Sequence, residues 1–235
     1  MVISVIFRIL EYYKELNSKS MKLKSEQELQ ANYDKFIAVI KKYFKGERLE
    51  KLLHMYSEEE LGSNLAVSPA SGSKHYHNAY FGGYIDHIFN VTKNALKMRD
   101  LFVAQGGVID FTEEELVFSC LHHDLGKLGI KGEVHYLPNQ DEWSQKKYGT
   151  LFVRNDKIPY MTLTDRTFFT LNHYGIQYNE KEYFALKLTD GMYDEDNQKY
   201  LAGHDLKKQL VYKLQFIMHW ADHMSTIIER QDNTI

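Results

Sequence analysis

The sequence of 235 residues has one cysteine, three prolines and no long apolar run. A single cysteine, Cys120, excludes a disulfide within one chain and a zinc site built from thiolates, and it indicates a reducing, cytoplasmic setting. The apolar opening MVISVIFRIL is interrupted by Arg8 and is far shorter than the roughly 20 residues that span a bilayer. It also lacks the basic start and cleavage site of a secretory signal. We therefore expect no membrane partner, and we interpret the opening as an amphipathic helix or as a leader before a second start at Met21.

The chain also lacks a large excess of charge of either sign. The chain has 29 Lys and Arg against 32 Asp and Glu, a formal net charge of -3. This charge balance creates no long-range electrostatic field that would attract nucleic acid, so a small anionic substrate fits better than a polymer. A local basic cleft is still compatible with the balance. The length allows one substantial core and an appended segment. We predict an N-terminal helical extension over residues 1–60 and a main domain over residues 61–235, and the sequence leaves the oligomeric state open.

The three prolines lie in loop-like stretches, which favours a mainly α fold. Capping-box patterns at Ser25, Ser57 and Thr112, and a looser one at Asn179, mark four expected helix starts. Apolar periodicity predicts helices from Ser25 to about Gly46, from Thr112 to about Gly126, and over residues 83–105, 163–173, 181–190 and 206–230. Between Gly129 and Tyr160 we find no clear period and expect one small β-hairpin, made by GTLFV and KIPYM.

Four residues stand out in order along the chain. His123 and Asp124 close an apolar helix in the stretch LHHDLGK, His87 lies in GGYIDHIFNV, and Asp222 lies in HWADHMST. This H…HD…D order resembles the HD superfamily of metal-dependent phosphohydrolases, over roughly residues 74–229. The resemblance implies a helical bundle in which these four residues bind a divalent metal.

Two narrower resemblances concern the same region. The stretch HNAYFGGYIDH is similar to the HxAYxGGxxxH motif of HD-type 3′-to-5′ exoribonucleases, and the HWAD ending suits that branch. The overall pattern also resembles HD proteins carried by tailed phages. These resemblances imply an exonuclease as one alternative activity.

The chemistry of the ligand set supports the same interpretation. Two neutral imidazoles and two carboxylates form a mixed nitrogen and oxygen set that suits Mn, Fe, Co, Ni or Zn, and Mg is a further candidate. Four ligands leave two octahedral positions open, one for a water and one for a phosphate oxygen. This is the minimum that hydrolysis of a phosphoester requires.

Neighbouring residues receive provisional roles. Lys127 follows Asp124 by three positions, so it shares the face of the dipeptide and could bind substrate phosphate. Asp86, beside His87, could orient that ligand or act as general acid or base. His77 is a candidate for contacting the substrate. Alternatively, Asp86 is a solvated acid and Lys127 is a cation favoured by the end of its helix.

A second metal is doubtful. Two-metal members of the HD superfamily add histidines between the dipeptide and the last aspartate, whereas here the comparable stretch LKLTDGMYDE has Thr189 and Asp190. His173 and Asp190 are the remaining candidates for a second site, and His173 is also a candidate substrate contact. We therefore expect one divalent metal.

The other histidines have structural interpretations. A second dipeptide, His204-Asp205, follows a glycine and is expected to cap the last helix. His122 points about 100° away from His123 on a helix and is expected to be a spacer. His219 and His223 are expected in the wall of the site. The remaining three are expected on the surface or in loops: His54, His75 and His135.

Three functions follow from these patterns. The leading one is hydrolysis of a nucleotide phosphoester or phosphoanhydride by a metal-activated water. The second is a 3′-to-5′ exonuclease that acts on single-stranded nucleic acid. The third is a metal-stabilised nucleotide-binding or regulatory module without turnover.

Overall fold

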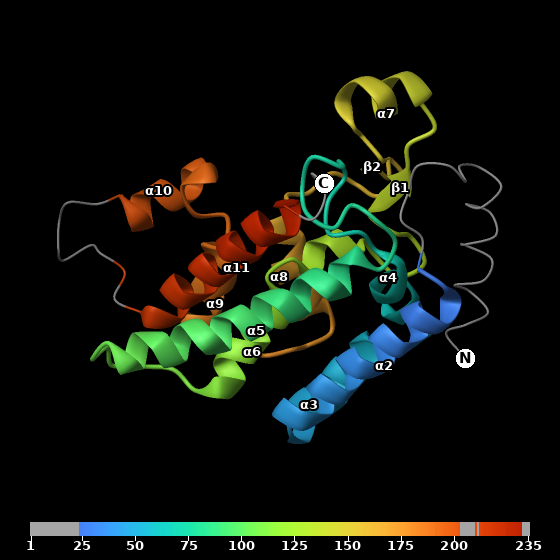
Figure 1. Cartoon of the computed structure of the whole chain (residues 1–235). Helices are drawn as coiled ribbons and strands as arrows, with labels where there is room; N and C mark the ends of the chain where they lie inside the picture. The colour runs from blue at the N-terminus through green and yellow to red at the C-terminus, as the bar shows by residue number, and fades with distance from the viewer. Residues whose placement is uncertain (1–23, 203–209, 211, 232–235) are drawn as a thin grey trace. The chain divides into compact units, whose positions relative to one another are not determined.

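The computed structural model describes residues 24–202, 210 and 212–231 (Figure 1). Two predictions lie outside the described residues, namely the helix at the N-terminus and the cap formed by His204 and Asp205. Within the described part the protein is mainly α-helical with one two-stranded sheet, which confirms the predicted fold class. None of the described helices is long and apolar enough to cross a bilayer.

The chain divides into two compact units. Unit 1 comprises Met1–His87, Leu125–Gln177 and Thr226–Ile235, and unit 2 comprises Ile88–Asp124 and Tyr178–Ser225. The described part of each unit contains its own apolar core. The domain boundary predicted near residue 60 stays a prediction.

Unit 1 combines helices of different lengths with the sheet. It contains α2 (Glu26–Tyr43), α3 (Gly46–Met55), α4 (Gly62–Val67), η1 (Leu125–Leu128), β1 (Tyr136–Pro138), α7 (Glu142–Tyr148), β2 (Phe152–Arg154) and α8 (Leu163–His173). Its apolar cluster joins α2, α4, the loop before α5 and the sheet: Leu29, Ala66, Val67, Ala79, Phe81, Leu151 and Phe152. Burial of these side chains is the main driving force that holds the sheet against the helices.

Unit 2 is built from helices in its described part. It contains most of α5 (Gly83–Ala104), α6 (Glu113–His122), α9 (Glu180–Lys187), η2 (Gly191–Tyr193), α10 (Glu195–Leu201) and most of α11 (Lys213–Gln231). Their apolar faces share one cluster: Val91, Ala95, Phe111, Leu116, Cys120, Ala185, Leu214, Ile217, Met218 and Ala221. The side chain of Asn179 donates to Glu115 at 2.6 Å and ties the start of α9 to α6.

Three of the four predicted helix starts are confirmed. Ser25, Thr112 and Asn179 each accept from the backbone three residues on, while the glutamate there accepts from the cap. The prediction at Ser57 is wrong, since that stretch is a turn and α4 begins at Gly62. The carboxylate of Glu60 instead accepts from Lys131 at 2.6 Å and from Tyr174 at 2.8 Å, so it does not close a capping box.

Helix bounds agree closely in two other places and differ in two. Helix α8 spans the predicted residues 163–173, and α5 ends one residue before the prediction. Helix α9 ends at Lys187 rather than at residue 190, because the backbone turns at Thr189, whose hydroxyl donates to Ala185 O at 2.8 Å. Helix α11 begins at Lys213, after the non-helical residues Leu210 and Tyr212, while residues 206–209 of the predicted helix lie outside the described residues.

The predicted hairpin is partly wrong. Phe152 and Val153 of GTLFV do form a strand, but β2 pairs antiparallel with β1, and KIPYM is not a strand. Asn155 ends the ladder, because its side-chain oxygen accepts from the backbone of Lys157 at 3.0 Å and forms a turn. Between the two strands the chain forms α7, which we did not predict and which Asp141 caps at its start.

Candidate metal centre

His123 is positioned by the end of α6. The helix is anchored in the core of unit 2 by Leu116 and Cys120, and its last turn places His123 with only 6% of its surface exposed. The backbone N–H of His123 donates to Ser119 O at 3.0 Å, and its ring Nδ1 lies 2.9 Å from Cys120 O. A carbonyl only accepts, so Nδ1 carries the proton and Nε2 is left to face other groups.

Two carboxylates lie next to that second nitrogen. His123 Nε2 is 3.4 Å from Asp124 Oδ2 and 3.6 Å from Asp222 Oδ1, all three residues belonging to unit 2. Burial disfavours the charged form of His123, but the carboxylates of Asp124 and Asp222 outweigh it and raise the pKa of the imidazole to about 10. The arrangement therefore favours a cation at Nε2, either a proton or a divalent metal ion.

The donors in unit 2 fit a metal. Potential ligand atoms of His123 and Asp222 lie within 4.8 Å of each other, in one of the groups of described residues that could hold a metal ion. An imidazole nitrogen that lies 3.4 Å from one carboxylate and 3.6 Å from another offers the mixed donors that borderline divalent metals accept. The coarse prediction that the chain has histidine and aspartate residues that could hold a metal is therefore confirmed.

Asp222 is held by the apolar face of α11. Ile217, Met218 and Ala221 are buried in the core of unit 2, and Ser225 accepts from the side chain of Asn94 at 2.8 Å. These contacts fix the rotation of the helix about its axis, so that Asp222 points toward His123.

The histidines around the dipeptide have partners of their own. His219 Nδ1 lies 2.7 Å from Thr189 O, beside Gly191, where a Cβ atom would come within 2.4 Å of the His219 ring. The ring of His223 stacks at 6.2 Å from that of His219. His122 is fully buried with Nδ1 2.7 Å from Phe118 O. Asp190 is the residue directly before η2 in the same unit.

His87 belongs to unit 1 and lies in the second turn of α5. It is fully buried, and its Nδ1 lies 2.9 Å from Glu229 Oε2 near the end of α11. Because a carboxylate accepts the Nδ1 proton, His87 offers Nε2 to a further partner, as His123 does. The ring of His77 lies 4.3 Å from that of His87, and their nitrogens come within 4.8 Å, so His77 is compatible with metal binding as well as with substrate contact.

Glu229 is the residue that the sequence interpretation missed. It is 4% exposed and belongs to unit 1, with its carboxylate directed at His87. A signal was present, because Glu229 follows Asp222 by seven residues and so shares its face of a helix. A buried carboxylate behind a histidine typically orients a metal ligand and raises its basicity.

Asp86 is engaged by three neighbours in unit 1. Its Oδ1 accepts from Asn32 at 2.8 Å, and its Oδ2 accepts from Tyr80 at 2.7 Å and pairs with Lys24 at 2.5 Å. These contacts join the start of α5 to α2, to the residues just before α2 and to the loop before α5. They favour a positioning role, while the acid–base role stays a prediction.

Lys127 lies in η1, directly after the dipeptide in the chain. Gly126 brings η1 against α8, because a Cβ atom there would lie 2.2 Å from Leu163 O. The backbone of Gly126 also donates to Thr167 Oγ1 at 3.0 Å. The position of Lys127 in unit 1 is thus set by backbone packing rather than by a continuing α-helix.

His173 lies elsewhere in unit 1. It is the last residue of α8, is exposed, and stacks on Phe169 at 6.2 Å. It lines a cavity of about 260 Å³ with Phe169, Tyr174 and Ile130. Its predicted contact with substrate stays a prediction.

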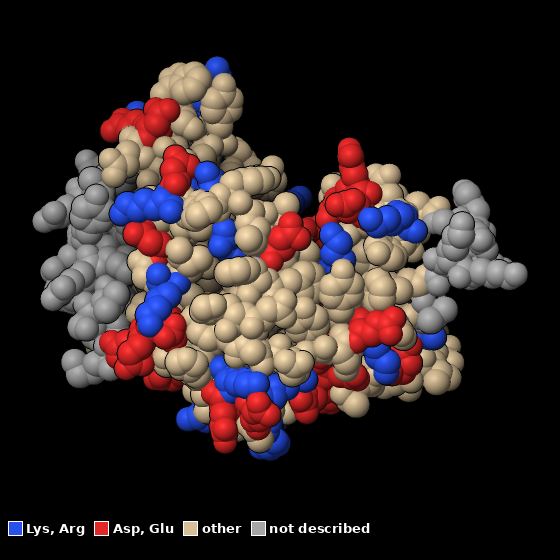
Figure 2. Space-filling model, turned by 180° about the vertical axis from the view of Figure 1, so that it is seen from behind, with Lys and Arg blue, Asp and Glu red and all other residues tan. Residues whose placement is uncertain are grey.

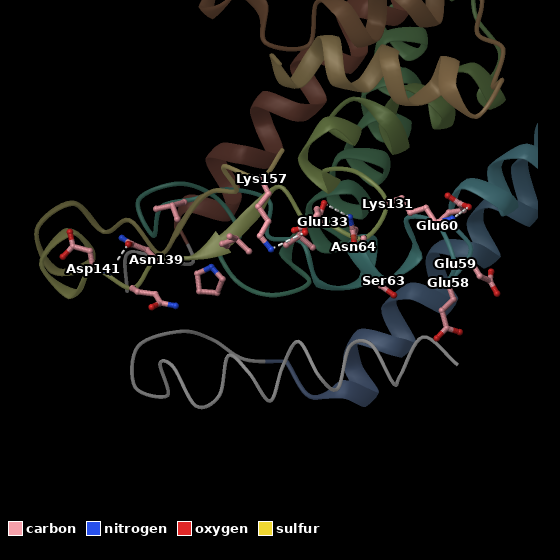
Figure 3. Close-up of a pocket in the computed structure, with 16 residues that line it drawn as sticks. Glu58, Glu59, Glu60, Ser63, Asn64, Lys131, Glu133, Asn139, Asp141 and Lys157 are labelled. Carbon is pink, nitrogen blue, oxygen red and sulfur yellow. Dashed lines mark hydrogen bonds and ion pairs between the residues drawn. The ribbon is translucent and has the colours of Figure 1, made fainter. Parts of the chain in front are cut away.

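A second cavity of unit 1, of about 1000 Å³, is acidic (Figure 3). Its charged lining consists of Glu58, Glu59, Glu60, Glu133, Asp141, Lys131 and Lys157. The two lysines are paired, Lys131 with Glu60 at 2.6 Å and Lys157 with Glu133 at 3.4 Å. None of the predicted ligands lines this cavity, and its excess of carboxylates does not suit an anionic substrate.

His135 lies in a loop, which is one of its two predicted placements, and it is buried there, with 9% of its surface exposed. Burial, and then the charges of Arg166, Arg154 and Lys127, lower its pKa to about 4. His135 is therefore a neutral imidazole at neutral pH.

This shift predicts a pH-dependent stability. Below pH 6.5 the unfolded chain binds the His135 proton more readily than the folded chain, so the contribution is complete above pH 6.5 and is lost as the pH falls toward about 4. We expect the free energy of unfolding of wild type relative to His135→Gln to fall by about 2 kcal/mol between pH 7 and pH 4, measured by urea denaturation. An equal difference at both pH values would contradict the assignment.

Comparison with known proteins gives one partial similarity. No family model matches this sequence, and no solved structure matches it. The chain is 31% identical to the dihydroneopterin 2′,3′-cyclic phosphate phosphodiesterase of Methanocaldococcus jannaschii, over 34% of this chain and 40% of that protein. The match thus spans less than half of the relative's length. Over part of its length, the chain is similar to a cyclic phosphate phosphodiesterase.

Proposed function

We propose that this chain is an HD-type, metal-dependent phosphohydrolase that cleaves a phosphoester or phosphoanhydride bond in a small nucleotide-like molecule. The observation that carries the proposal is the approach of the Asp124 and Asp222 carboxylates, at 3.4 and 3.6 Å, to the ring nitrogen of His123 that its backbone hydrogen bond leaves available. The partial similarity to a phosphodiesterase supports the same class of chemistry.

The proposed ligands are His87, His123, Asp124 and Asp222. Each histidine directs Nδ1 at an acceptor, Glu229 or Cys120 O, which keeps Nε2 available as a ligand atom. When bound, a divalent metal supplies a water of lowered pKa and neutralises charge on a phosphate oxygen.

The chain's own residues would position the substrate. The Lys127 ammonium would bind a phosphate oxygen, held in place by the packing of η1 on α8. Asp86 would need to give up contacts with Lys24 and Tyr80 in order to move a proton, so we assign it the positioning of His87. His77 would contact the substrate or add a ligand beside His87.

The surface charge supports a small substrate. On the face shown in Figure 2, Lys and Arg side chains lie among Asp and Glu side chains. The whole chain likewise has 29 Lys and Arg against 32 Asp and Glu. A protein that binds long nucleic acid strands usually has an excess of basic residues to neutralise the phosphate backbone, so this balance favours a nucleotide-sized substrate over a polymer.

The test is a metal and substrate panel. The purified protein is treated with EDTA, loaded in turn with Mn, Co, Ni, Mg or Zn, and assayed on nucleotides, 2′,3′-cyclic phosphates and labelled oligonucleotides. Turnover of a small phosphoester with at least one metal is expected. Release of mononucleotides from oligonucleotides, strongly weakened by salt, would indicate the exonuclease instead. Binding without turnover for every metal would indicate a regulatory module.

Glu229→Gln provides a separate prediction. The substitution keeps the shape but removes the charge behind His87, and we expect the affinity for Mn or Co to fall about 10- to 100-fold. Isothermal titration of the metal-free protein measures this change. Glu142→Gln, in an exposed pair with Lys146 on α7, is the matched control and should bind metal like wild type. Unchanged affinity in a folded Glu229→Gln would argue that this carboxylate serves only the packing of α11.

A further inference from the structure

Arg166 is a buried cation in unit 1. It lies in the first half of α8, is 5% exposed, and donates from Nη2 to Pro159 O at 2.6 Å. Among the residues that the structure describes, no carboxylate pairs with it. A guanidinium does not lose its proton in proteins, and a buried charge without an opposite charge is costly. The position therefore calls for an anion.

A second guanidinium converges on the same backbone. Arg154, at the end of β2, donates from Nη1 to Ile158 O at 3.0 Å, the carbonyl next to the one that Arg166 binds. Its ion pair with Asp156, which is 92% exposed, contributes little. Burial, and then repulsion by the nearby charge of Arg154, lower the pKa of Arg166. Repulsion between them increases the attraction that a shared anion would find.

Two further groups border these arginines. Asn155, next to Arg154, donates its backbone N–H to His135 O at 2.8 Å, and the charges of Arg154, Arg166 and Lys127 all act on the His135 ring. Lys127 is brought toward α8 by Gly126, whose backbone binds Thr167 next to Arg166. The end of β2 and the start of α8 thus bring two guanidiniums to adjacent carbonyls, and η1 and the loop before β1 place Lys127 and the neutral His135 ring near enough for the charges of all three cations to act on that ring.

We propose that Arg154 and Arg166, with Lys127 and His135 beside them, form a subsite that binds a phosphate group of the substrate. Three cations suit a doubly charged phosphate, two guanidiniums offer paired donors to its oxygens, and a neutral imidazole can add one N–H. The statement that this phosphate belongs to the substrate rests on the proposed function. It narrows the substrate to molecules with a terminal phosphate monoester or a polyphosphate. The binding of phosphate itself does not depend on turnover.

The test uses the full-length protein freed of metal with EDTA, so that phosphate cannot bind through a metal. Thermal unfolding and isothermal titration are measured with inorganic phosphate and pyrophosphate, against chloride at equal ionic strength. Wild type should bind either anion and unfold at a higher temperature in its presence. Arg166→Met should weaken this binding at least about tenfold while unfolding at the same or a higher temperature than wild type in chloride.

Control variants distinguish phosphate binding at this site from a general effect of positive charge on the protein. Arg99→Met removes the same charge in unit 2, where Arg99 pairs with Glu113 at 2.7 Å, and it should leave phosphate binding unchanged. Arg154→Gln, on a more exposed side chain, should weaken binding and covers the case in which Arg166→Met does not fold. The proposal is overturned if wild type does not bind phosphate, or if Arg166→Met and Arg154→Gln bind it like wild type. If the wild type binds phosphate but shows no metal-dependent turnover, only the proposed function as a hydrolase is overturned.

Discussion

Asp124→Asn is expected to lower metal-dependent phosphoester hydrolysis by about 1000-fold or more. The substitution keeps the size of the side chain but removes one of the two carboxylates that face His123. Losing a charged ligand removes several kcal/mol of transition-state stabilisation, and each 1.36 kcal/mol corresponds to a factor of ten in rate. Steady-state kinetics with the preferred metal, together with measurement of bound metal, checks this expectation.

The chain provides its own matched control for this experiment. Asp205→Asn alters the second His-Asp dipeptide, which lacks matching partners in the sequence, and it should leave turnover within about twofold of wild type. Comparable losses in both variants would mean that the loss is not specific to the first dipeptide. Full activity of a folded, metal-loaded Asp124→Asn would refute the proposed ligand set.

Gly126→Ala is expected to destabilise the protein by about 2 to 3 kcal/mol and to reduce turnover as well. The added Cβ would lie 2.2 Å from Leu163 O and 3.0 Å from Leu163 Cα, and backbone atoms cannot rotate away as a flexible side chain can. Helix η1 must then move off α8, which displaces Lys127 and weakens the hydrogen bond to Thr167. Urea denaturation measures the loss of stability.

Gly106→Ala separates packing from backbone conformation. Gly106 has a left-handed φ of +88° but nothing within 4 Å of the added Cβ, so we expect a cost of about 1 kcal/mol and unchanged turnover. The explanation by close packing fails if Gly126→Ala costs no more than this control.

Local sequence accounts for most of the helix starts. A serine, threonine or asparagine cap and its glutamate act within four residues, so Ser25, Thr112 and Asn179 identify helices without tertiary information. The same pattern misleads at Ser57, because Glu60 has partners 71 and 114 residues away. A local pattern predicts structure only where no distant group competes for the same atoms.

Strand pairing could not be predicted in the same way. The strand around Phe152 could be recognised from its own residues. Its partner, Tyr136–Pro138, comes earlier in the sequence, and α7 lies between the two strands along the chain. The choice between this partner and KIPYM depends on which segment completes the core with Phe81 and Leu29. Burial in three dimensions decided that pairing.

By itself, the sequence determined the mainly α fold and the His123-Asp124 dipeptide at the end of a helix, because caps, apolar periodicity and neighbouring residues act over a few positions. Only the tertiary structure decided that Asp222 faces His123, that Glu229 orients His87, and that Arg154 and Arg166 converge on adjacent carbonyls. These contacts join residues that are up to 142 positions apart. Their geometry follows from the packing of helices and loops around the cores, which no short stretch of sequence encodes.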